Sequence, residues 1–306
     1  ISGKIRRYFS RPGFSDSQIN LAALFQNIID VLFKIPLGFL QSFFLILFIR
    51  PKLVFSKGGS GSVVVCSAAR ILGIPVFLHE SDSVPGLSNV TVSKCAKKVF
   101  ISFPNTEYFD LTKAILVGNP IREELFNGNK EMAKEIFSLT FEKPVLLFLG
   151  GSQGSEPIND FVLLILSELL EKYEVIHVCG DKNYKRVRVE SQVVIKSQVI
   201  LSKDLEKYYH LYGSLDELQL KTALWVSNLI ISRAGAGSIF EIAALGKPSI
   251  LIPLPSAASD HQSKNAYQYA KTGAALVIGQ ESLTPNFFMG EISYLISSSE
   301  RMQNAA

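Results

Sequence analysis

A stretch near the C-terminus, residues 229–277, constrains the fold more than any other part of the chain. It begins with a short apolar run of strand length, Leu229–Ile231, which passes through a small-residue turn into the apolar-periodic segment Ile239–Leu245. A second apolar run, Ser249–Ile252, leads through a proline-containing loop to a helix-prone segment that begins near Asp260. Strand–loop–helix units repeated in this way predict a parallel α/β sheet whose loops meet at the carboxyl ends of the strands.

The loops of this stretch are suited to binding an anion. Small residues after a buried strand leave backbone N–H groups free, and the following helix, with Ser238 as the expected N-cap, adds its positive dipole end. Glu241 lies three residues after Ser238, which is capping-box spacing, so a purely structural role could also explain it. His261 and Gln262 lie near the start of the next helix. We interpret this rim as a nucleotide-sugar site; the alternative is an ordinary α/β unit with capped helices.

Two further glycine-rich turns follow predicted strands. Lys57–Ser62 comes after a short strand at Leu53–Phe55, and it is neither a Walker A sequence nor the dinucleotide pattern. Gly150–Ser155 comes after the unbroken apolar strand Val145–Leu149 and precedes a helix that starts near Pro157. The second turn again predicts an anion site, with the Ser152 hydroxyl as a donor to a phosphate.

A cluster of titratable residues follows the predicted strand Val76–Leu78. His79, Glu80 and Asp82 would lie at the carboxyl end of that strand, where a carboxylate could act as a general base if burial raised its pKa. The alternative is a solvated loop in which Asp82 or Ser83 caps the next helix.

The length of 306 residues predicts two domains. We expect an N-terminal domain over 1–122, a charged linker over 123–143 and a C-terminal domain over 144–306. Arg122 would lie at the junction, after a Gly-Asn-Pro turn. The three cysteines show no metal-ligand spacing, so the sequence predicts no metal site and a reducing, cytoplasmic environment.

The charge is concentrated in the first part of the chain. Residues 1–130 contain 15 Lys and Arg against 8 Asp and Glu, whereas the whole chain has a net charge of +4. These basic residues form no recognisable nucleic-acid motif, so we expect no nucleic-acid partner. The apolar segment Ile35–Ile49 is too short to span a bilayer. It is either a buried helix on a sheet or a helix that dips into an anionic membrane surface beside Lys34, Arg50 and Lys52.

Five motifs together resemble one family over nearly the whole chain. They are KGGSGS, HESDSVPGLSN, VGNPIR, GGSQGS and RAGAGSIFEIAALGKPSILIPLP…DHQSKNA. In this order they resemble the bacterial lipid I N-acetylglucosaminyltransferases, the MurG family. The resemblance implies an α/β GT-B fold, with two Rossmann-like domains whose parallel sheets face each other across a cleft. It also implies inverting transfer of GlcNAc from UDP-GlcNAc to undecaprenyl-linked lipid I at the cytoplasmic face of the cell membrane, for peptidoglycan synthesis and without a cofactor.

The resemblance also implies roles for individual residues. Glu241 matches the carboxylate that binds the ribose hydroxyls, and Leu215 is the candidate for a backbone contact to uracil. On the acceptor side, Glu80 and Asp82 are the candidate catalytic residues. The matched donor-binding positions are Arg122, Ser152, Leu215, Ala236, Gly237, Ser238, Ile239, Phe240, Glu241, His261 and Gln262, and the acceptor-side positions are Gly58, Gly59, Ser60 and Asp82.

The sequence departs from the family pattern at several positions. Asp82 replaces an Asn, Ser60 replaces a Tyr, and His261 replaces the first residue of a Gln-Gln pair. The family's N-terminal G-G-T-G-G-H loop, with its essential His, has no match, so the resemblance implies that this chain lacks an N-terminal segment and is inactive alone. The alternatives are another GT-B lipid glycosyltransferase, a UDP-sugar epimerase, or a non-catalytic UDP-sugar-binding remnant.

Overall fold

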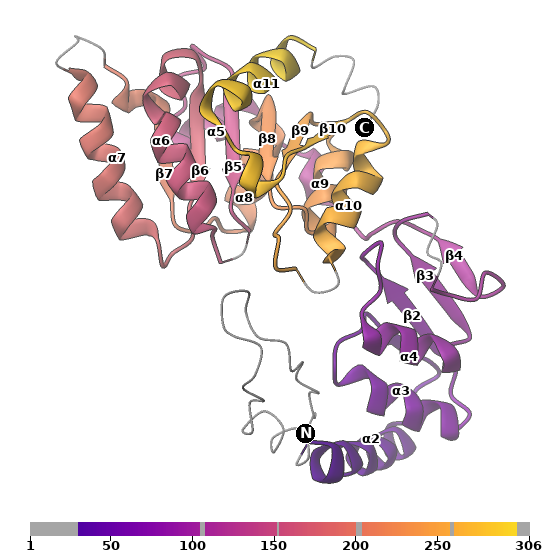
Figure 1. Cartoon of the computed structure of the whole chain (residues 1–306). Helices are drawn as coiled ribbons and strands as arrows, with labels where there is room; N and C mark the ends of the chain where they lie inside the picture. Colours follow the sequence, from indigo (N-terminus) through magenta and orange to yellow (C-terminus); the bar gives the residue numbers. More distant parts are fainter. Residues whose placement is uncertain (1–29, 105–107, 152, 200–203, 258–259, 299–306) are drawn as a thin grey trace, which may run out of the picture. The chain divides into compact units, whose positions relative to one another are not determined.

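The computed structural model of the chain describes residues 30–104, 108–151, 153–199, 204–257 and 260–298 (Figure 1). The chain divides into two compact units, Ile1–Gly118 and Asn119–Ala306. Each unit has its own parallel sheet. The candidate phosphate donor Ser152 lies outside the described residues, and so does the basic segment 1–29.

The first unit contains a four-stranded sheet in the order β1-β2-β3-β4, with all neighbours parallel. Its buried core joins the sheet to α2, α3 and α4 through residues such as Leu78, Ala69 and Val92. The elements are the π-helix η1 (Asp30–Lys34), α2 (Ile35–Ile49), β1 (Val54–Ser56), α3 (Ser62–Ile71), β2 (Val76–Glu80), α4 (Leu87–Cys95), β3 (Lys98–Ile101) and β4 (Ala114–Leu116).

Helix α2 is apolar on every side but buries little of its surface. It packs on α3, and Gly38 and Ile46 are its buried residues. Large apolar side chains such as Phe44 and Phe48 are exposed on the outer face, Phe48 to 81%. With the preceding turn, the stretch Leu32–Ile49 forms 18 helical residues, enough by length and composition to cross a membrane. The expectation of a buried helix on the sheet was wrong for most of this surface, because α3 covers only one stripe of α2.

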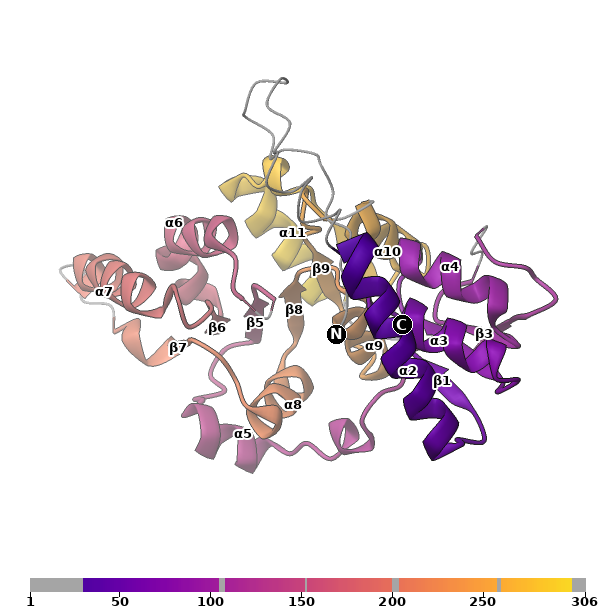
Figure 2. The same ribbon diagram turned by 90° about the horizontal axis from the view of Figure 1, so that it is seen from below.

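The second unit contains a six-stranded parallel sheet in the order β10-β9-β8-β5-β6-β7. Figure 2 shows α6 and α11 on one side of this sheet and α8 on the other. The elements are η2 (Glu123–Phe126), α5 (Lys130–Phe137), β5 (Val145–Leu149), α6 (Glu156–Lys172), β6 (Glu174–Val178), α7 (Tyr184–Val199), η3 (Glu206–Tyr208), β7 (Tyr209–Tyr212), α8 (Glu217–Val226), β8 (Leu229–Ser232), α9 (Ala236–Ala244), β9 (Ser249–Leu251), α10 (His261–Ala270), β10 (Ala275–Val277), η5 (Gln280–Ser282) and α11 (Pro285–Ser297).

The strand order of the second unit fixes where a ligand can bind. The chain starts at β5, builds outward through β6 and β7, and then returns to place β8 on the other side of β5. The order therefore reverses between β5 and β8, and the loops that leave these two strands diverge. In parallel α/β sheets, the crevice at such a switch point is where ligands bind.

Some expected elements differ from those observed. Of the expected strand Val199–Leu201, Val199 is the last residue of α7, and the other two residues lie outside the described part of the chain. The edge strand of this sheet is β7. Strand β7 has the sequence YHLY, and all four residues are partly exposed, so no alternation of buried and exposed positions marks it in the sequence. The expected linker 123–143 lies within the second unit, where Phe137 is fully buried. Strand β2 continues through His79 and Glu80, which were expected to lie in the following loop.

Candidate functional site

A cavity of about 690 Å³ lies at the carboxyl ends of β5 and β8, where the strand order of the second unit reverses. Its walls come from the β5–α6 turn, from Arg233 after β8, from Leu254 to Ser256 after β9, and from Gln262 and Gln280. The volume lies within the range of ordinary small-molecule sites. The glycine-rich turn and the polar groups of the C-terminal stretch thus meet in one place.

The β5–α6 turn is shaped by glycines that no other residue could replace without strain. Gly151 and Gly154 have φ angles of 85° and 76°, in the left-handed region. A Cβ on Gly154 would lie 2.2 Å from the carbonyl oxygen of Cys179, so the turn packs directly against the end of β6. Close packing of this kind lets the backbone approach a ligand, as glycine-rich turns do at phosphate sites.

Arg233 ties the loops around the cavity together, and the sequence reasoning assigned it no role. Its side chain is 7% exposed. One guanidinium nitrogen donates to the carbonyls of Ile252 and Pro253, at 3.1 and 3.0 Å, and the other donates to Ser155 Oγ and Gln280 Oε1, both at 2.6 Å. A charged residue directly after a buried strand was the available signal. Because the planar guanidinium has five donors in fixed directions, it can hold several loops in register.

Helix α9 begins shortly after the carboxyl end of β8, and the N–H groups of its first turn have no partner within the helix. Its N-cap is Gly235, which has no side-chain cap, so the expected N-cap Ser238 lies inside the first turn instead. The N–H of Ile239 is used within the helix, donating to Gly235 O at 3.1 Å, and its side chain is buried. The N–H groups of Ala236, Gly237 and Ser238 are therefore the ones that helix geometry leaves for a ligand.

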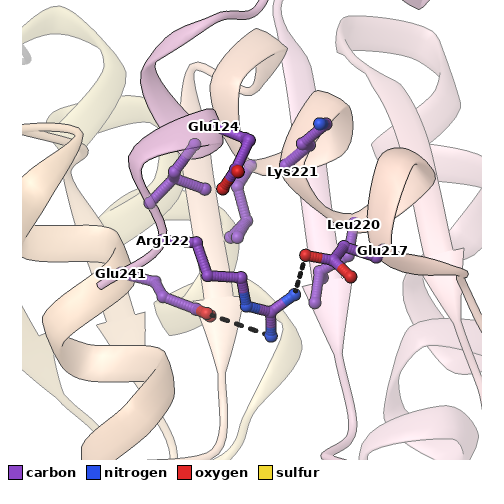
Figure 3. Close-up of a pocket in the computed structure, with 8 residues that line it drawn as sticks. Arg122, Glu124, Glu217, Leu220, Lys221 and Glu241 are labelled. Atoms are coloured by element: carbon purple, nitrogen blue, oxygen red, sulfur yellow. Dashed lines mark ion pairs between the residues drawn. The ribbon is translucent and has the colours of Figure 1, made fainter. Parts of the chain in front are cut away.

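Glu241 and Arg122 form an ion pair on the second unit (Figure 3). Arg122 Nη2 lies 3.8 Å from Glu241 Oε1, and Arg122 Nη1 lies 3.1 Å from Glu217 Oε1 on α8. The side chains of Arg122 and Glu217 are more than half exposed, so these pairs contribute little stability and can be exchanged for ligand contacts. The space beside them measures about 10 Å³ and admits no more than about one water.

Burial raises the pKa of the Glu241 carboxyl above its ordinary value, and the nearby Arg122 guanidinium opposes this shift. Since Ser238 does not cap α9, no capping box forms between Ser238 and Glu241. The capping alternative for Glu241 is therefore wrong. A half-buried carboxylate beside an arginine is suited to accepting hydrogen bonds from paired hydroxyl groups.

The remaining donor-side candidates lie in different surroundings. Gln262 lines the switch-point cavity, where its Oε1 accepts a 3.0 Å hydrogen bond from the Leu254 N–H. His261 begins α10, directly after Asp260, which has a left-handed φ of 54°. Leu215 lies in the loop before α8, whose start is fixed by a capping box between Asp216 and Gln219. The residues that line the cavity include neither His261 nor Leu215.

The first unit gathers its candidate residues at the ends of β1 and β2. Glu80 is buried, and its carboxylate accepts from the Asp82 N–H at 2.9 Å and from Asn89 Nδ2 at 2.6 Å. Burial raises the pKa of Glu80, and these two hydrogen bonds oppose the shift. A Cβ on Gly58, whose φ is 92°, would lie 2.2 Å from Asn89 Oδ1. Asn89 thus lies against both the glycine turn and Glu80. The alternative of a solvated loop in which Asp82 or Ser83 caps the next helix is wrong, since Glu80 is buried and the N-cap of α4 is Gly86.

Ser60 and Gly59 lie in the turn that follows β1. The Gly59 carbonyl accepts from the Ser62 hydroxyl at 2.7 Å, and a Cβ on Gly59 would meet nothing within 4 Å. Ser60 itself is exposed at the surface. Within the described ranges, no group of three His, Cys, Asp or Glu side chains could hold a metal ion.

Comparisons with known families match both units of the chain. The glycosyltransferase family 28 C-terminal domain matches residues 145–306, and the glycosyltransferase family 28 N-terminal domain matches residues 13–101. The C-terminal match alone covers more than half of the chain.

Curated relatives match along almost its whole length. A Clostridium novyi protein is 38% identical over 98% of this chain and 76% of its own length, and a Clostridium tetani protein is 35% identical over the same shares. A Treponema denticola protein is 35% identical over 100% of this chain and 75% of its own length. All three are named UDP-N-acetylglucosamine–N-acetylmuramyl-(pentapeptide) pyrophosphoryl-undecaprenol N-acetylglucosamine transferase.

Solved structures agree with these relatives. The crystal structure of Acinetobacter baumannii MurG is 26% identical, with a TM-score of 0.69 over 90% of this chain and 74% of that one. A UDP-GlcNAc 2-epimerase from Neisseria meningitidis has a TM-score of 0.61 over 96% of this chain and 77% of that one, but is only 15% identical, so it shares the fold alone.

Proposed function

The chain belongs to glycosyltransferase family 28 and to its MurG members, and from this premise we propose how its residues carry out their reaction. That reaction transfers GlcNAc from UDP-GlcNAc to N-acetylmuramyl-(pentapeptide) pyrophosphoryl-undecaprenol, which converts lipid I to lipid II in peptidoglycan synthesis. The observation that carries the assignment is the 35–38% identity to these transferases along nearly the whole chain. The epimerases share only the fold.

The second unit holds the donor. Glu241 accepts hydrogen bonds from the ribose hydroxyls in exchange for its contact with Arg122, and the backbone before α8, near Leu215, contacts uracil. The diphosphate lies between the N-terminus of α9 and the β5–α6 turn. Gln262 reads hydroxyl groups of the sugar. The cavity at the switch point and the free N–H groups of Ala236, Gly237 and Ser238 support this placement.

The transfer inverts the anomeric centre. A base removes the proton from the MurNAc 4-hydroxyl, the oxygen attacks the anomeric carbon of GlcNAc, and the bond from that carbon to the diphosphate breaks. The pair of electrons leaves with UDP, whose added negative charge is stabilised by the α9 N-terminus and the turn N–H groups. Glu80 and Asp82 are the candidates for the base, and the raised pKa of Glu80 is the property that such a base requires.

The direct test is transfer of radiolabelled GlcNAc from UDP-GlcNAc to a lipid I analogue. The chain spans about three quarters of the length of its curated relatives. The assay is therefore run both with this chain and with the chain preceded by the N-terminal segment of a relative. We expect product from the extended protein. If neither protein forms product or binds UDP in calorimetry, the proposed function is wrong.

A substitution at Glu241 tests the donor site by itself. Glu241→Ala removes the acceptor for the ribose hydroxyls, and we expect UDP affinity to fall about tenfold to a hundredfold, as for a lost charged hydrogen-bond acceptor. Isothermal titration calorimetry measures the change. Glu217→Ala is the matched control, since it removes the other ion pair of Arg122 and should change the affinity less than about threefold. Equal effects in both variants would exclude the ribose role.

We also propose that α2 docks the first unit on an anionic membrane surface, as a peripheral protein at the cytoplasmic face. The exposed apolar side chains of α2 support this, because Leu45, Phe48 and Ile49 are more than half exposed on one helix. Lys34, Arg50 and Lys52 flank them and would meet lipid phosphates.

Liposome co-sedimentation tests the docking surface. We expect Phe48→Asp to reduce binding to vesicles containing phosphatidylglycerol by about tenfold. The variant loses one large apolar side chain that would be buried in the membrane, and it adds a negative charge that the anionic lipid repels. Leu164→Asp on α6 is the matched control, since Leu164 is also highly exposed but lies in the second unit. If the two variants sediment alike, α2 is not the membrane surface.

A further inference from the structure

A buried chain of hydrogen bonds runs behind the β5–α6 turn, and it takes no direct part in the site described above. Three polar side chains form it: Tyr209 on β7, His177 on β6 and Asn159 on α6. His177 and Asn159 are 1% and 0% exposed. They lie among apolar core residues, and the ring of His177 meets that of Phe148 edge-on at 6.2 Å.

The protonation of this chain follows from its partners. Asn159 Nδ2 lies 2.9 Å from the Cys179 carbonyl, which can only accept, so Nδ2 donates and Oδ1 faces His177. Oδ1 can only accept, so His177 Nε2, at 3.0 Å, carries a proton. Burial lowers the pKa of His177 to about 3, so its ring is neutral and Nδ1 carries no proton. Nδ1 accepts the Tyr209 hydroxyl proton at 2.8 Å.

The chain of hydrogen bonds ends at the Cys179 carbonyl, against which the β5–α6 turn packs. The Cys179 oxygen accepts from Asn159 and also from Asn183 Nδ2 at 3.0 Å. It is the same oxygen that a Cβ on Gly154 would approach to 2.2 Å. Asn159 also lies on the first turns of α6, and its N–H donates to the carbonyl of Ser155 at 2.9 Å. The C-terminal end of the turn, at Gly154 and Ser155, thus lies against groups that Asn159 contacts.

Packing alone does not account for these residues. A buried polar side chain costs free energy unless every donor and acceptor is paired, and a leucine or phenylalanine would fill the same volume without that requirement. In this hydrogen-bond network, each nitrogen of the His177 ring and each polar atom of the Asn159 amide has a partner. A fully paired buried network fixes the atoms at its ends more narrowly than apolar contacts do.

We propose that His177 is a positioning residue for the donor diphosphate. It holds Asn159 in the orientation that fixes the Cys179 carbonyl, and this carbonyl seats the β5–α6 turn. His177 does not line the switch-point cavity, so any effect on a ligand must pass through the turn. The inference rests on the proposed function, since it takes the turn to bind the diphosphate of UDP-GlcNAc.

The experiment compares ligands with and without phosphate on the full chain. UDP and uridine are titrated into wild-type protein and into His177→Phe, His177→Gln and Leu166→Ala. Calorimetry measures UDP binding, and ligand-observed NMR measures uridine binding. His177→Phe leaves the Asn159 and Tyr209 groups unpaired, whereas the Gln side chain can still donate to Asn159. Leu166, which is fully buried on α6 in the same core, is the control for loss of stability without loss of the network.

We expect His177→Phe to weaken UDP about tenfold and to leave uridine unchanged. His177→Gln should recover most of the UDP affinity. Leu166→Ala should leave the ratio of UDP affinity to uridine affinity at the wild-type value. If His177→Phe fails to fold, two other variants test the hydrogen bonds through the same ratio of UDP affinity to uridine affinity. They are His177→Gln and Tyr209→Phe, and the second removes the Tyr209 hydroxyl that donates to His177 Nδ1.

The outcomes separate the two proposals. A wild-type protein that binds UDP no better than uridine would contradict the diphosphate site and hence the proposed function. A wild type that prefers UDP, with the same preference in every foldable variant of His177 and Tyr209, would overturn the positioning role alone. The positioning role would also be overturned if Leu166→Ala changed the ratio of UDP affinity to uridine affinity as much as His177→Phe does. The turn would then respond to any loss of core packing.

Discussion

Glu174 has a fully buried carboxylate at the start of β6. It accepts from the N–H groups of Thr140 and Phe141 at 2.8 and 3.0 Å, and from His210 Nε2 at 2.9 Å. Burial acts to raise its pKa, but the His210 contact and the two backbone donors outweigh burial, so the pKa of Glu174 is lowered. This single side chain joins the segment before β5 to the start of β6 and to the edge strand β7.

We expect Glu174→Gln to destabilise the second unit by about 2–4 kcal/mol at pH 7, since an NH₂ group replaces one of the two buried oxygens and faces N–H donors that it cannot accept from. A lowered folded-state pKa means that the stabilisation is complete above the unfolded-state pKa. It is lost as the pH falls through the folded-state value, so the difference from wild type should shrink below about pH 4.5. Urea unfolding between pH 3 and 8 measures this.

Glu168→Gln is the matched control for Glu174, because Glu168 pairs only with Lys172 on the exposed face of α6. Its effect should be about 0.5 kcal/mol or less. A Glu174 variant whose stability follows that of the control at every pH would show that the buried carboxylate does not hold the segment.

Single residues were predicted unevenly from the sequence. The ribose-binding role of Glu241 follows from the family resemblance and stays a prediction. Its spacing from Ser238 also allowed a capping role, which the observed start of α9 excludes. Arg233 was not assigned a role, although its four hydrogen bonds organise the cavity. The reason is physical, since its partners come from loops after three other strands and are distant in the sequence.

At the scale of elements, the β5–α6 turn shows how a local sequence and a tertiary contact combine. The run Gly150–Ser155 identified a turn at a helix N-terminus. It did not reveal that Gly154 packs against the end of β6, because that contact is made by a neighbouring strand.

Gly154→Ala tests this contact. The left-handed φ of 76° and the Cys179 oxygen at 2.2 Å both oppose a Cβ, so we expect a loss of about 2–4 kcal/mol and weaker UDP binding. Thermal unfolding and calorimetry measure the two effects. Gly290→Ala in α11 is the control, since nothing lies within 4 Å of its Cβ position and the helical backbone favours alanine by about 0.5–1 kcal/mol. A Gly154 variant as stable as this control would contradict the close packing.

Helix α2 illustrates the limit of periodicity. Its sequence is apolar on every side, so no stripe distinguishes a buried face from an exposed one. Only its packing on α3 shows that one side is covered and that residues such as Phe48 remain exposed.

At the scale of the molecule, the proposed donor site lies within the second unit. Its sheet, its core and every residue that lines the switch-point cavity lie between Asn119 and Ala306. We expect residues 119–306 expressed alone to fold and to bind UDP within about threefold of the full chain, since each unit has its own core. Circular dichroism and calorimetry measure this. Loss of UDP binding by a folded fragment would mean that the first unit contributes directly to the donor site.

The sequence by itself determined the fold class, the family and the order of the strand–loop–helix units. These features are encoded locally, in apolar runs, in glycine-rich turns and in motifs that keep their order along the chain. Only the tertiary structure decided which loops meet at the switch point, that Arg233 links them, and which side of α2 is exposed. Those outcomes depend on strand order and on contacts between distant segments, and a linear pattern of polarity does not specify either one.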